Sequence, residues 1–244
     1  SLRMVDEPTQ QEAVRAAAAA VADRLEDEKG HLTELDSAIG DADHGSNLAR
    51  GFRAAAEAVA DDEESTPQEL VKTIGVTLIS EVGGASGPLY GGSIMSASAT
   101  LEEGLTAESS VAFAEAYLEK VKDRGDAQLG AKTMVDALTP AVHTFKKSIE
   151  VDELPPLTAL AKATAAAERG VEYTVPLRAQ KGRASFLGWR SVGHQDPGAT
   201  STWFIMQELL DVADDYLEGE TDADASSPTI PEETPDETDE EEEA

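Results

Sequence analysis

The sequence predicts an all-α fold, a single domain of about eight helices, and three observations support this prediction. Alanine is abundant along the chain, and it has the strongest intrinsic preference for helix. Apolar residues recur at three- and four-residue spacing, which places them on one face of a helix. Runs in which β-branched and polar residues alternate, the pattern of a half-buried strand, are missing.

The predicted helices follow one another from residue 9 to residue 217. The first covers 9–28, with Val14, Val21 and Leu25 on its apolar face and Gly30 as a stop. The helix over 66–82 begins at Thr66-Pro67, because a hydroxyl cap followed by proline is typical of a helix start. The others are expected over 32–39, 45–59, 92–102, 106–124, 132–148 with an interruption or kink near Pro140, 156–173 and 199–217.

The chain is strongly acidic, with 49 Asp and Glu against 19 Lys and Arg among its 244 residues. The formal charge of −30 argues against nucleic acid or an anionic membrane as a partner, since both would repel the chain. The absence of cysteine excludes disulfides, thiolate metal sites and cysteine nucleophiles. No apolar run approaches the ~20 residues that a membrane helix needs, and the first residues lack the apolar core of a signal peptide. We therefore expect a cytoplasmic protein.

The acidity is concentrated at the C-terminus, where residues 218–244 include 13 acidic residues and no basic one. Such a segment cannot bury enough apolar surface to order itself, so we expect a disordered tail after a folded domain of residues 1–217. The domain alone still carries a net charge of −17. This excess is typical of proteins from a high-salt cytoplasm, such as that of a halophilic archaeon, because salt screens the self-repulsion. An acidic mesophilic protein with an interaction tail is the alternative.

Three of the expected connections are unusually rich in glycine. The stretches 36–51, 83–92 and 178–198 hold 12 of the 19 glycines. Glycine lets a backbone approach a ligand closely, whereas an ordinary connection between helices carries a single glycine stop. We therefore expect these loops to form a binding site at one end of the bundle.

The first of these loops places three carboxylates, Asp36, Asp41 and Asp43, just before a predicted helix. Carboxylate oxygens without sulfur or paired histidines favour a hard cation such as Mg²⁺ or Ca²⁺, although an aspartate here could simply cap the helix. The first helical residues, from His44 to Asn47, would present free backbone N–H groups, which favour phosphate. Carboxylates for Mg²⁺ beside N–H groups for phosphate are what a magnesium nucleotide requires.

The remaining stretches give weaker signals. The loop 83–92 could cradle phosphate through N–H groups and Ser86, but it lacks the lysine of a Walker loop and could equally be a tight packing loop. In 125–136, Met134 is expected in the core or against a base. Four of the 19 cations fall within 13 residues of the third loop, which suits either phosphate recognition or the balancing of nearby acids. They are Arg178, Lys181, Arg183 and Arg190.

The order of these motifs resembles the L-subunit family of dihydroxyacetone kinases. The motifs read GDADHGSN from residue 40, GGASGPLYG from 83, KTMVDALTP from 132, GRASFLG from 182 and GHQDPGA from 193. The resemblance runs from about Leu32 to Met206. It implies an all-α barrel of eight antiparallel helices with a nucleotide bound at one end.

The resemblance also implies roles for individual residues. Metal ligands for two Mg²⁺ ions would be Asp36, Asp41 and Asp43. Residues that bind ADP or ATP would be His44, Gly45, Ser46, Asn47, Ala85, Ser86, Gly125, Met134, Arg183, Asp196, Pro197 and Gly198. Arg183 would also be catalytic, since it would stabilise charge on the transferring phosphoryl group.

Two positions depart from the family pattern, which usually has Gly at Ala42 and often Thr at Ala85. If position 42 has a positive φ, alanine there costs about 1 kcal/mol. Because the aspartate ligands are intact, we expect nucleotide binding to survive.

The resemblance implies a phosphotransferase, a glycerone kinase subunit that works with a separate K subunit holding dihydroxyacetone covalently on a histidine. Some members use ATP as co-substrate; others keep ADP bound and have it rephosphorylated by a phosphohistidine carrier, the M subunit, fed from phosphoenolpyruvate. The length of the chain favours the second mode. The alternatives are an ATP-dependent glycerone kinase, a related kinase acting on another carrier such as a fatty-acid-binding partner, and a non-enzymatic module that senses Mg²⁺ or nucleotide. The sequence does not decide the oligomeric state, and a homodimer is compatible with it.

Overall fold

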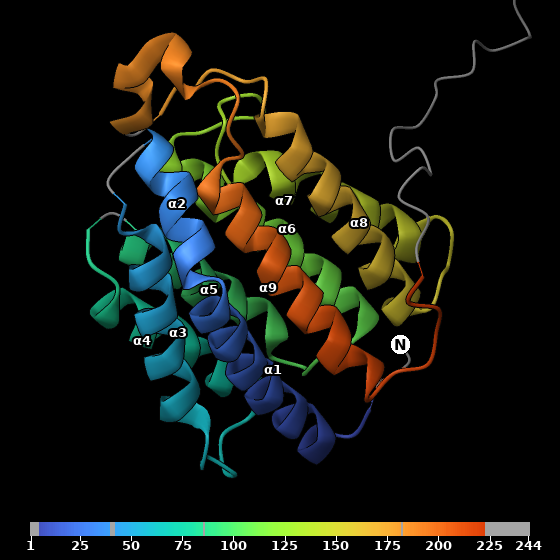
Figure 1. Ribbon diagram of the computed structural model, residues 1–244. Coiled ribbons are helices and arrows are strands. Elements are labelled where there is room, and N and C mark those ends of the chain that lie inside the picture. The colour runs from blue at the N-terminus through green and yellow to red at the C-terminus, as the bar shows by residue number, and fades with distance from the viewer. Residues whose placement is uncertain (1–4, 40–41, 85, 182, 223–244) are drawn as a thin grey trace, which may run out of the picture.

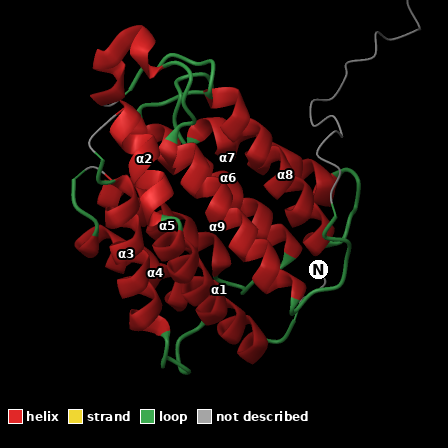
Figure 2. Ribbon diagram, viewed as in Figure 1, coloured by secondary structure: helices red, strands yellow, loops and turns green. Residues whose placement is uncertain are grey.

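The computed structural model describes residues 5–39, 42–84, 86–181 and 183–222, and this part of the chain is helical with no strand (Figures 1 and 2). Eight helices pack in series and the last returns to the first, which closes a ring. This confirms the predicted single-domain barrel of about eight helices. In order they are α1 (Glu7–Asp27), α3 (His44–Val59), α4 (Pro67–Glu81), α5 (Gly92–Ala97), α6 (Ala107–Gly125), α7 (Val135–Glu150), α8 (Pro156–Thr174) and α9 (Pro197–Asp214).

Further short helical segments accompany the barrel helices. Helix α2 (Lys29–Ile39) follows α1 directly, so Gly30 lies inside α2 and is not the expected stop. The 3₁₀-helix η3 (Arg183–Ser191) projects beyond the end of α2, within a stretch expected to be loop (Figure 1). A π-helical turn, η1 (Gly87–Gly91), precedes α5, and a 3₁₀ turn, η2 (Ser98–Leu101), follows it.

The helix starts follow from capping chemistry. The Asp6 carboxylate accepts a hydrogen bond from the Thr9 N–H at the start of α1, and the Thr66 hydroxyl accepts one from the Glu69 N–H at the start of α4. A cap satisfies one of the four N–H groups that a helix leaves without an internal partner. The Thr66-Pro67 prediction is therefore confirmed.

Helices α7 and α8 approach each other closely at one point. Helix α7 begins three residues later than expected and continues through Pro140 without interruption. Since Pro140 has no N–H, the carbonyl of Asp136 loses its donor within the helix. Gly170 of α8 lies against that carbonyl, and a Cβ at this position would come within 2.2 Å of the oxygen. A small apolar cluster surrounds the contact: Ala137, Ala141, Ala163, Ala167, Val171 and Ala199.

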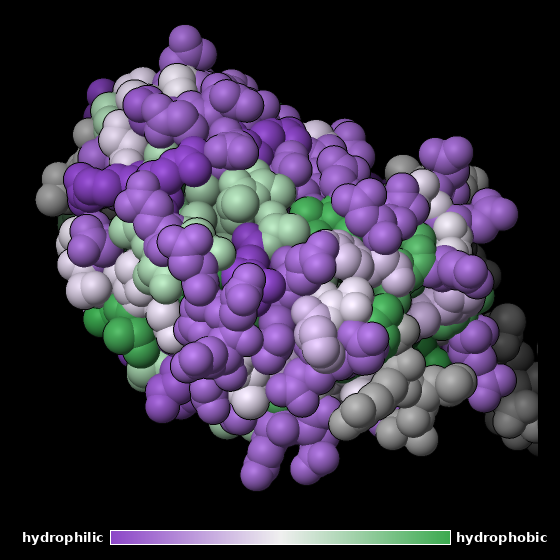
Figure 3. All heavy atoms as spheres, turned by 90° about the horizontal axis from the view of Figure 1, so that it is seen from below, coloured by the Kyte–Doolittle hydropathy of each residue, from purple (hydrophilic) through white to green (hydrophobic). Residues whose placement is uncertain are grey.

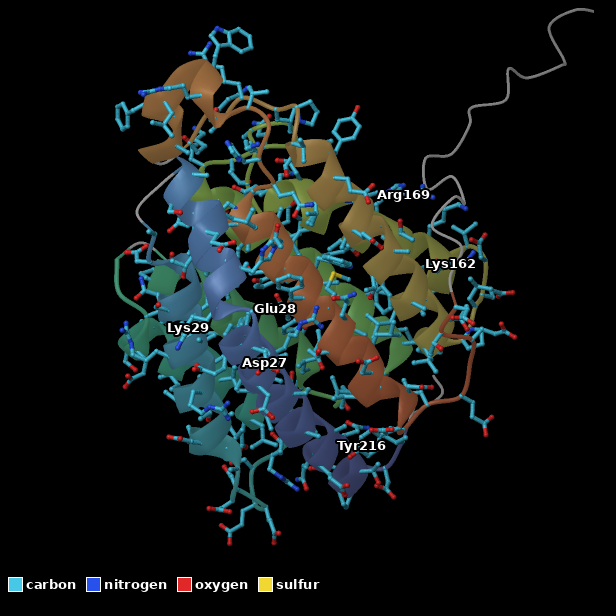
Figure 4. All side chains as sticks on the ribbon, viewed as in Figure 1. Asp27, Glu28, Lys29, Lys162, Arg169 and Tyr216 are labelled. Carbon is cyan, nitrogen blue, oxygen red and sulfur yellow. The ribbon has the colours of Figure 1, made fainter. Side chains whose placement is uncertain are left out.

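The described chain ends at the opposite end of the barrel from η3. The Tyr216 hydroxyl donates to Glu12 Oε1 over 3.0 Å, and the Glu220 N–H donates to Thr158 Oγ1 over 2.9 Å (Figure 4). Seen from below, the surface consists mainly of hydrophilic side chains (Figure 3). Most of the expected tail, residues 223–244, lies outside the described residues. Within the described ranges, no helix has the length and hydropathy needed to cross a bilayer.

Candidate functional site

The first glycine-rich loop brings a carboxylate to the start of α3. One oxygen of Asp36, Oδ2, accepts hydrogen bonds from the N–H groups of Asp43 (2.9 Å) and His44 (3.1 Å). Among the described residues, no hydrogen bond reaches the other oxygen, Oδ1. Asp43 itself is exposed, and its side chain makes no capping bond. The capping role considered for this loop therefore falls to Asp36, with one oxygen left for a ligand.

The donor chemistry at this turn suits a hard divalent cation, because Asp36 and Asp43 offer carboxylate oxygens and no soft ligand. The third expected ligand, Asp41, lies outside the described residues. Among those that are described, no three acidic or imidazole groups converge on one point. The first turn of α3 also leaves N–H groups for an anion, since no described group accepts from Gly45 or Ser46.

His44 joins this turn to the second and third loops. Its Nε2 lies 3.0 Å from Ser201 Oγ in the first turns of α9, and its ring centroid lies 6.2 Å from that of Tyr90 in η1. Burial lowers the pKa of His44, against the opposing effect of Asp36. Burial raises the pKa of Tyr90, which is 3% exposed. At neutral pH both rings are therefore uncharged, and they form a polar but neutral wall of the site.

The third loop ends at Asp196, which begins α9. Its carboxylate accepts from the Ala199 N–H (2.8 Å), and its own N–H donates to Thr174 Oγ1 (2.9 Å). Burial raises the pKa of Asp196 to about 7, although hydrogen bonding to Ala199 and the nearby charge of Lys132 oppose the shift. The side chain is thus committed to capping α9, and what it presents to a ligand is the backbone of Pro197 and Gly198.

The residues expected near the base lie close to these loops. Met134 is 4% exposed and belongs to the main core, which agrees with the first of the two expectations for it. A Cβ at Gly198 would lie 3.6 Å from Met134, so the α7 start and the α9 start are in contact. Gly125 ends α6, and a Cβ there would lie 3.6 Å from Leu89 of η1. Both residues therefore line the same end of the barrel as His44.

The cations of the third loop have mixed partners. Lys181 pairs with Asp126 over 3.2 Å, which matches the charge-balancing interpretation, and the Arg178 guanidinium lies 5.3 Å from the centre of the Trp189 ring. Arg190 is exposed. The backbone of Arg183 begins η3, but its side chain lies outside the described part, as does the whole of Ala85. Ser86 is half-buried at the start of η1.

Position 42 has the backbone that was suspected from the sequence. Ala42 has φ of +61°, in the left-handed region that favours glycine. The turn therefore holds a strained residue beside the proposed metal ligands.

Several residues at this end were given no role by the sequence. Tyr90 and Ser201 complete the contact around His44. Lys132 and Asp136 are both buried, and the charges of Asp136 and Asp196 favour the ammonium form of Lys132. A signal for Tyr90 existed, since it lies within the second glycine-rich stretch. Ser201 gave none, because a serine one turn into an apolar helix is an ordinary residue.

Comparisons with known proteins agree on one family. A family model described as the DAK2 domain matches residues 38–211. The ADP-binding subunit DhaL of the PEP-dependent dihydroxyacetone kinase of Escherichia coli (strain K12) is 42% identical over 184 residues, which cover 75% of this chain and 87% of the relative. The corresponding subunit of dihydroxyacetone kinase 1 of Listeria innocua is 38% identical over 189 residues, which cover 77% of this chain and 89% of the relative.

Longer proteins and solved structures match as well. L-erythrulose 1-kinase of Mycolicibacterium smegmatis is 33% identical over 75% of this chain but only 32% of its own length. The crystal structure of the dihydroxyacetone kinase of C. freundii superposes with a TM-score of 0.62 at 28% identity, and its complex with AMP-PNP and Mg²⁺ with 0.61 at 26%. Each match covers 86% of this chain, which spans about a third of those solved chains. The chain belongs to the DAK2-domain family.

Proposed function

We propose that this chain is the nucleotide-binding subunit of a dihydroxyacetone kinase, which presents a magnesium-bound adenine nucleotide to dihydroxyacetone held on a partner subunit. One observation carries the proposal. The Asp36 carboxylate, from α2, is bonded to the N–H groups of Asp43 and His44 at the start of α3. The N–H groups of Gly45 and Ser46 belong to the first turn of α3, and His44 of that turn lies against Ser201 in α9. Anion donors beside cation ligands are the combination that a metal-bound polyphosphate needs.

The proposed mechanism relies on positioning and charge neutralisation, as phosphoryl transfer does in general. The N–H groups of Gly45 and Ser46 would donate to phosphate oxygens, with the positive end of the α3 dipole behind them. Asp36, Asp41 and Asp43 would hold two Mg²⁺ ions, which would neutralise charge on the phosphates. Arg183, whose backbone begins η3, would stabilise the charge on the transferring phosphoryl group.

The neutral state of His44 fits this arrangement. Burial lowers the pKa of His44, which favours the uncharged ring. Its proposed role is to hold the first turn of α3 against α9 through Ser201. Asn47, one turn further on, accepts from Arg50 over 3.3 Å, which fixes its side-chain amide.

Phosphoenolpyruvate is the proposed source of the phosphoryl group. The relatives that resemble this chain over most of their own length carry the names of PEP- or PTS-dependent subunits. In this mode ADP would stay bound and be rephosphorylated in place by a phosphohistidine carrier, the M subunit, and the K subunit would hold the substrate. Both would approach from the η3 end, where Phe186 and Trp189 are 87% and 77% exposed.

A second candidate is the same nucleotide chemistry with a different acceptor. The longer relatives include L-erythrulose 1-kinase and triokinase/FMN cyclase, in which the matching region is about a third of the protein. This observation favours a related keto-sugar as the alternative substrate, held by a partner chain.

Reconstitution tests the proposal directly. The chain is mixed with the K subunit of a related PEP-dependent kinase and dihydroxyacetone in high KCl, with ATP or with phosphoenolpyruvate and its carrier proteins as donor. We expect dihydroxyacetone phosphate to form with the phosphoenolpyruvate chain. Formation with ATP alone would assign the ATP-dependent mode. Absence of product with both donors, while a matched native L subunit is active, would refute the proposal.

A further inference from the structure

Residues 175–195 leave the barrel at the end of α8 and return just before α9, carrying η3 between them. Two hydrogen bonds close the base of this excursion, one between backbone groups and one from a backbone N–H to a side-chain hydroxyl. The Gly193 N–H donates to the Val175 carbonyl over 2.7 Å, and the Asp196 N–H donates to the Thr174 hydroxyl over 2.9 Å. We call residues 175–181 and 183–195 the η3 segment.

The side chain of Lys132 reaches the same base from the α6–α7 connection. Lys132 is 3% exposed, and its ammonium donates to the carbonyl of Thr174 over 2.5 Å and to the carbonyl of His194. Thr174 ends α8, and its carbonyl also accepts from the Leu177 N–H over 3.1 Å. One ammonium group thus joins the point where the η3 segment departs to the point where it returns.

Two carboxylates compensate the buried charge. Asp196 and Asp136 both favour the ammonium form of Lys132, against burial, which lowers its pKa. Asp136 in turn fixes the connection that carries Lys132, since it accepts from the N–H groups of Gly130 (2.6 Å) and Thr133 (2.9 Å). A buried ammonium with fewer partners would be strongly destabilising, so these groups act as one unit.

The backbone of Lys132 is strained in addition. Its φ is +62°, a left-handed conformation that costs an ordinary residue about 1–2 kcal/mol. The adjacent carbonyl of Ala131 accepts from the Gln180 N–H over 3.1 Å. The α6–α7 connection is therefore also bonded to the backbone of the η3 segment. A residue that combines backbone strain with a buried charge often has a functional role.

We propose that Lys132 is a positioning residue that clamps both ends of the η3 segment and so holds η3 and the start of α9 over the nucleotide site. The consequence for the nucleotide rests on the proposed function, whereas the clamp itself does not. Met134, two residues along, contacts Gly198, so the same connection orders the α9 start from its other side.

Trp189 provides a reporter for this clamp, because it lies in η3 and the chain has only one other tryptophan, Trp203. In a Trp203→Phe background, we compare Lys132→Met with Lys146→Met, which removes a half-exposed lysine of α7 that pairs with Glu115 over 3.1 Å. We expect Lys132→Met to lower the fluorescence anisotropy of Trp189 and to weaken Mg·ADP binding about tenfold, the size typical for losing a group that orients a ligand-binding element. Lys146→Met should change neither.

A merely stabilising lysine would lower the melting temperature but leave both signals of the folded protein unchanged, and that result would overturn the inference. So would a fall in anisotropy with unchanged ADP affinity. If Lys132→Met does not fold, amide hydrogen exchange of the wild-type chain tests the clamp instead. The Gly193 and Asp196 amides should exchange far more slowly than the amides of η3. Equally fast exchange at both places would overturn the clamp. Failure of wild-type chain to bind Mg·ADP would count against the proposed function, while anisotropy and exchange would still test the clamp.

Discussion

Replacing Ala42 by glycine should stabilise the protein. Ala42 has φ of +61°, and a side chain in this region costs about 1–2 kcal/mol through the contact of Cβ with the backbone. Glycine removes this cost but gains conformational entropy in the unfolded chain, which offsets about 0.4–1 kcal/mol. The difference predicts that Ala42→Gly raises the free energy of unfolding by about 0.5–1 kcal/mol.

Equilibrium urea unfolding in high KCl measures this change, and thermal unfolding should show a rise of about 2 °C for a domain of this size. Ala19→Gly is the matched control, because Ala19 is exposed in the middle of α1, where the same substitution costs about 1 kcal/mol. The two substitutions should therefore change stability in opposite directions. If Ala42→Gly is destabilised as much as Ala19→Gly, the strain assigned to this turn is absent and the reasoning is refuted.

Three further predictions concern the site and the tail. Asp43→Ala should abolish Mg²⁺-dependent retention of ADP in equilibrium dialysis, while the helical circular dichroism signal stays unchanged. The control Asp61→Ala, in the exposed α3–α4 loop, should still retain ADP. Unchanged retention in both Asp43→Ala and Asp41→Ala would remove the metal assignment. The pKa of Asp196 is about 7 when folded and about 4 when unfolded, so the stability due to its protonated form is complete below pH 4 and is lost as pH rises through 7. Urea unfolding should therefore show that Asp196→Asn loses less stability than wild type between pH 5 and 8, and parallel profiles would contradict this. Deletion of residues 218–244 should leave phosphoryl transfer to dihydroxyacetone intact, since the described chain ends at the opposite end from η3; loss of transfer in that assay would show that the tail takes part.

The fold could be predicted almost completely from the sequence, because the signals are local. Apolar spacing identifies each of the nine α-helices in the described residues, and the Thr66-Pro67 start is correct to the residue. The errors concern a glycine, a proline and the stretch 183–191, which was expected to be loop and forms η3. Gly30 lies inside α2, and α7 continues through Pro140, where Gly170 of the neighbouring helix lies against the freed carbonyl. A contact between two helices cannot be read from either one alone.

The site could be predicted in part, because only its local signals can be read from the sequence. Glycine-rich loops and clustered aspartates are visible in the sequence, and the structure brings the first loop, η1 and the α9 start together around His44. The sequence did not show which aspartates cap helices and which are left to bind a ligand. Asp36 bonds to the start of α3 from the preceding helix, whereas Asp196 caps α9 locally through the Ala199 N–H. The clamp by Lys132 depends on carbonyls 42 and 62 residues away.

A crystal structure of the full chain with Mg²⁺ and ADP tests the central claim most directly. We expect two metal ions bound by Asp36, Asp41 and Asp43, with phosphate oxygens within hydrogen-bonding distance of the N–H groups of Gly45 and Ser46. Density for the nucleotide elsewhere, or none at this end with the three aspartates turned apart, would contradict the account.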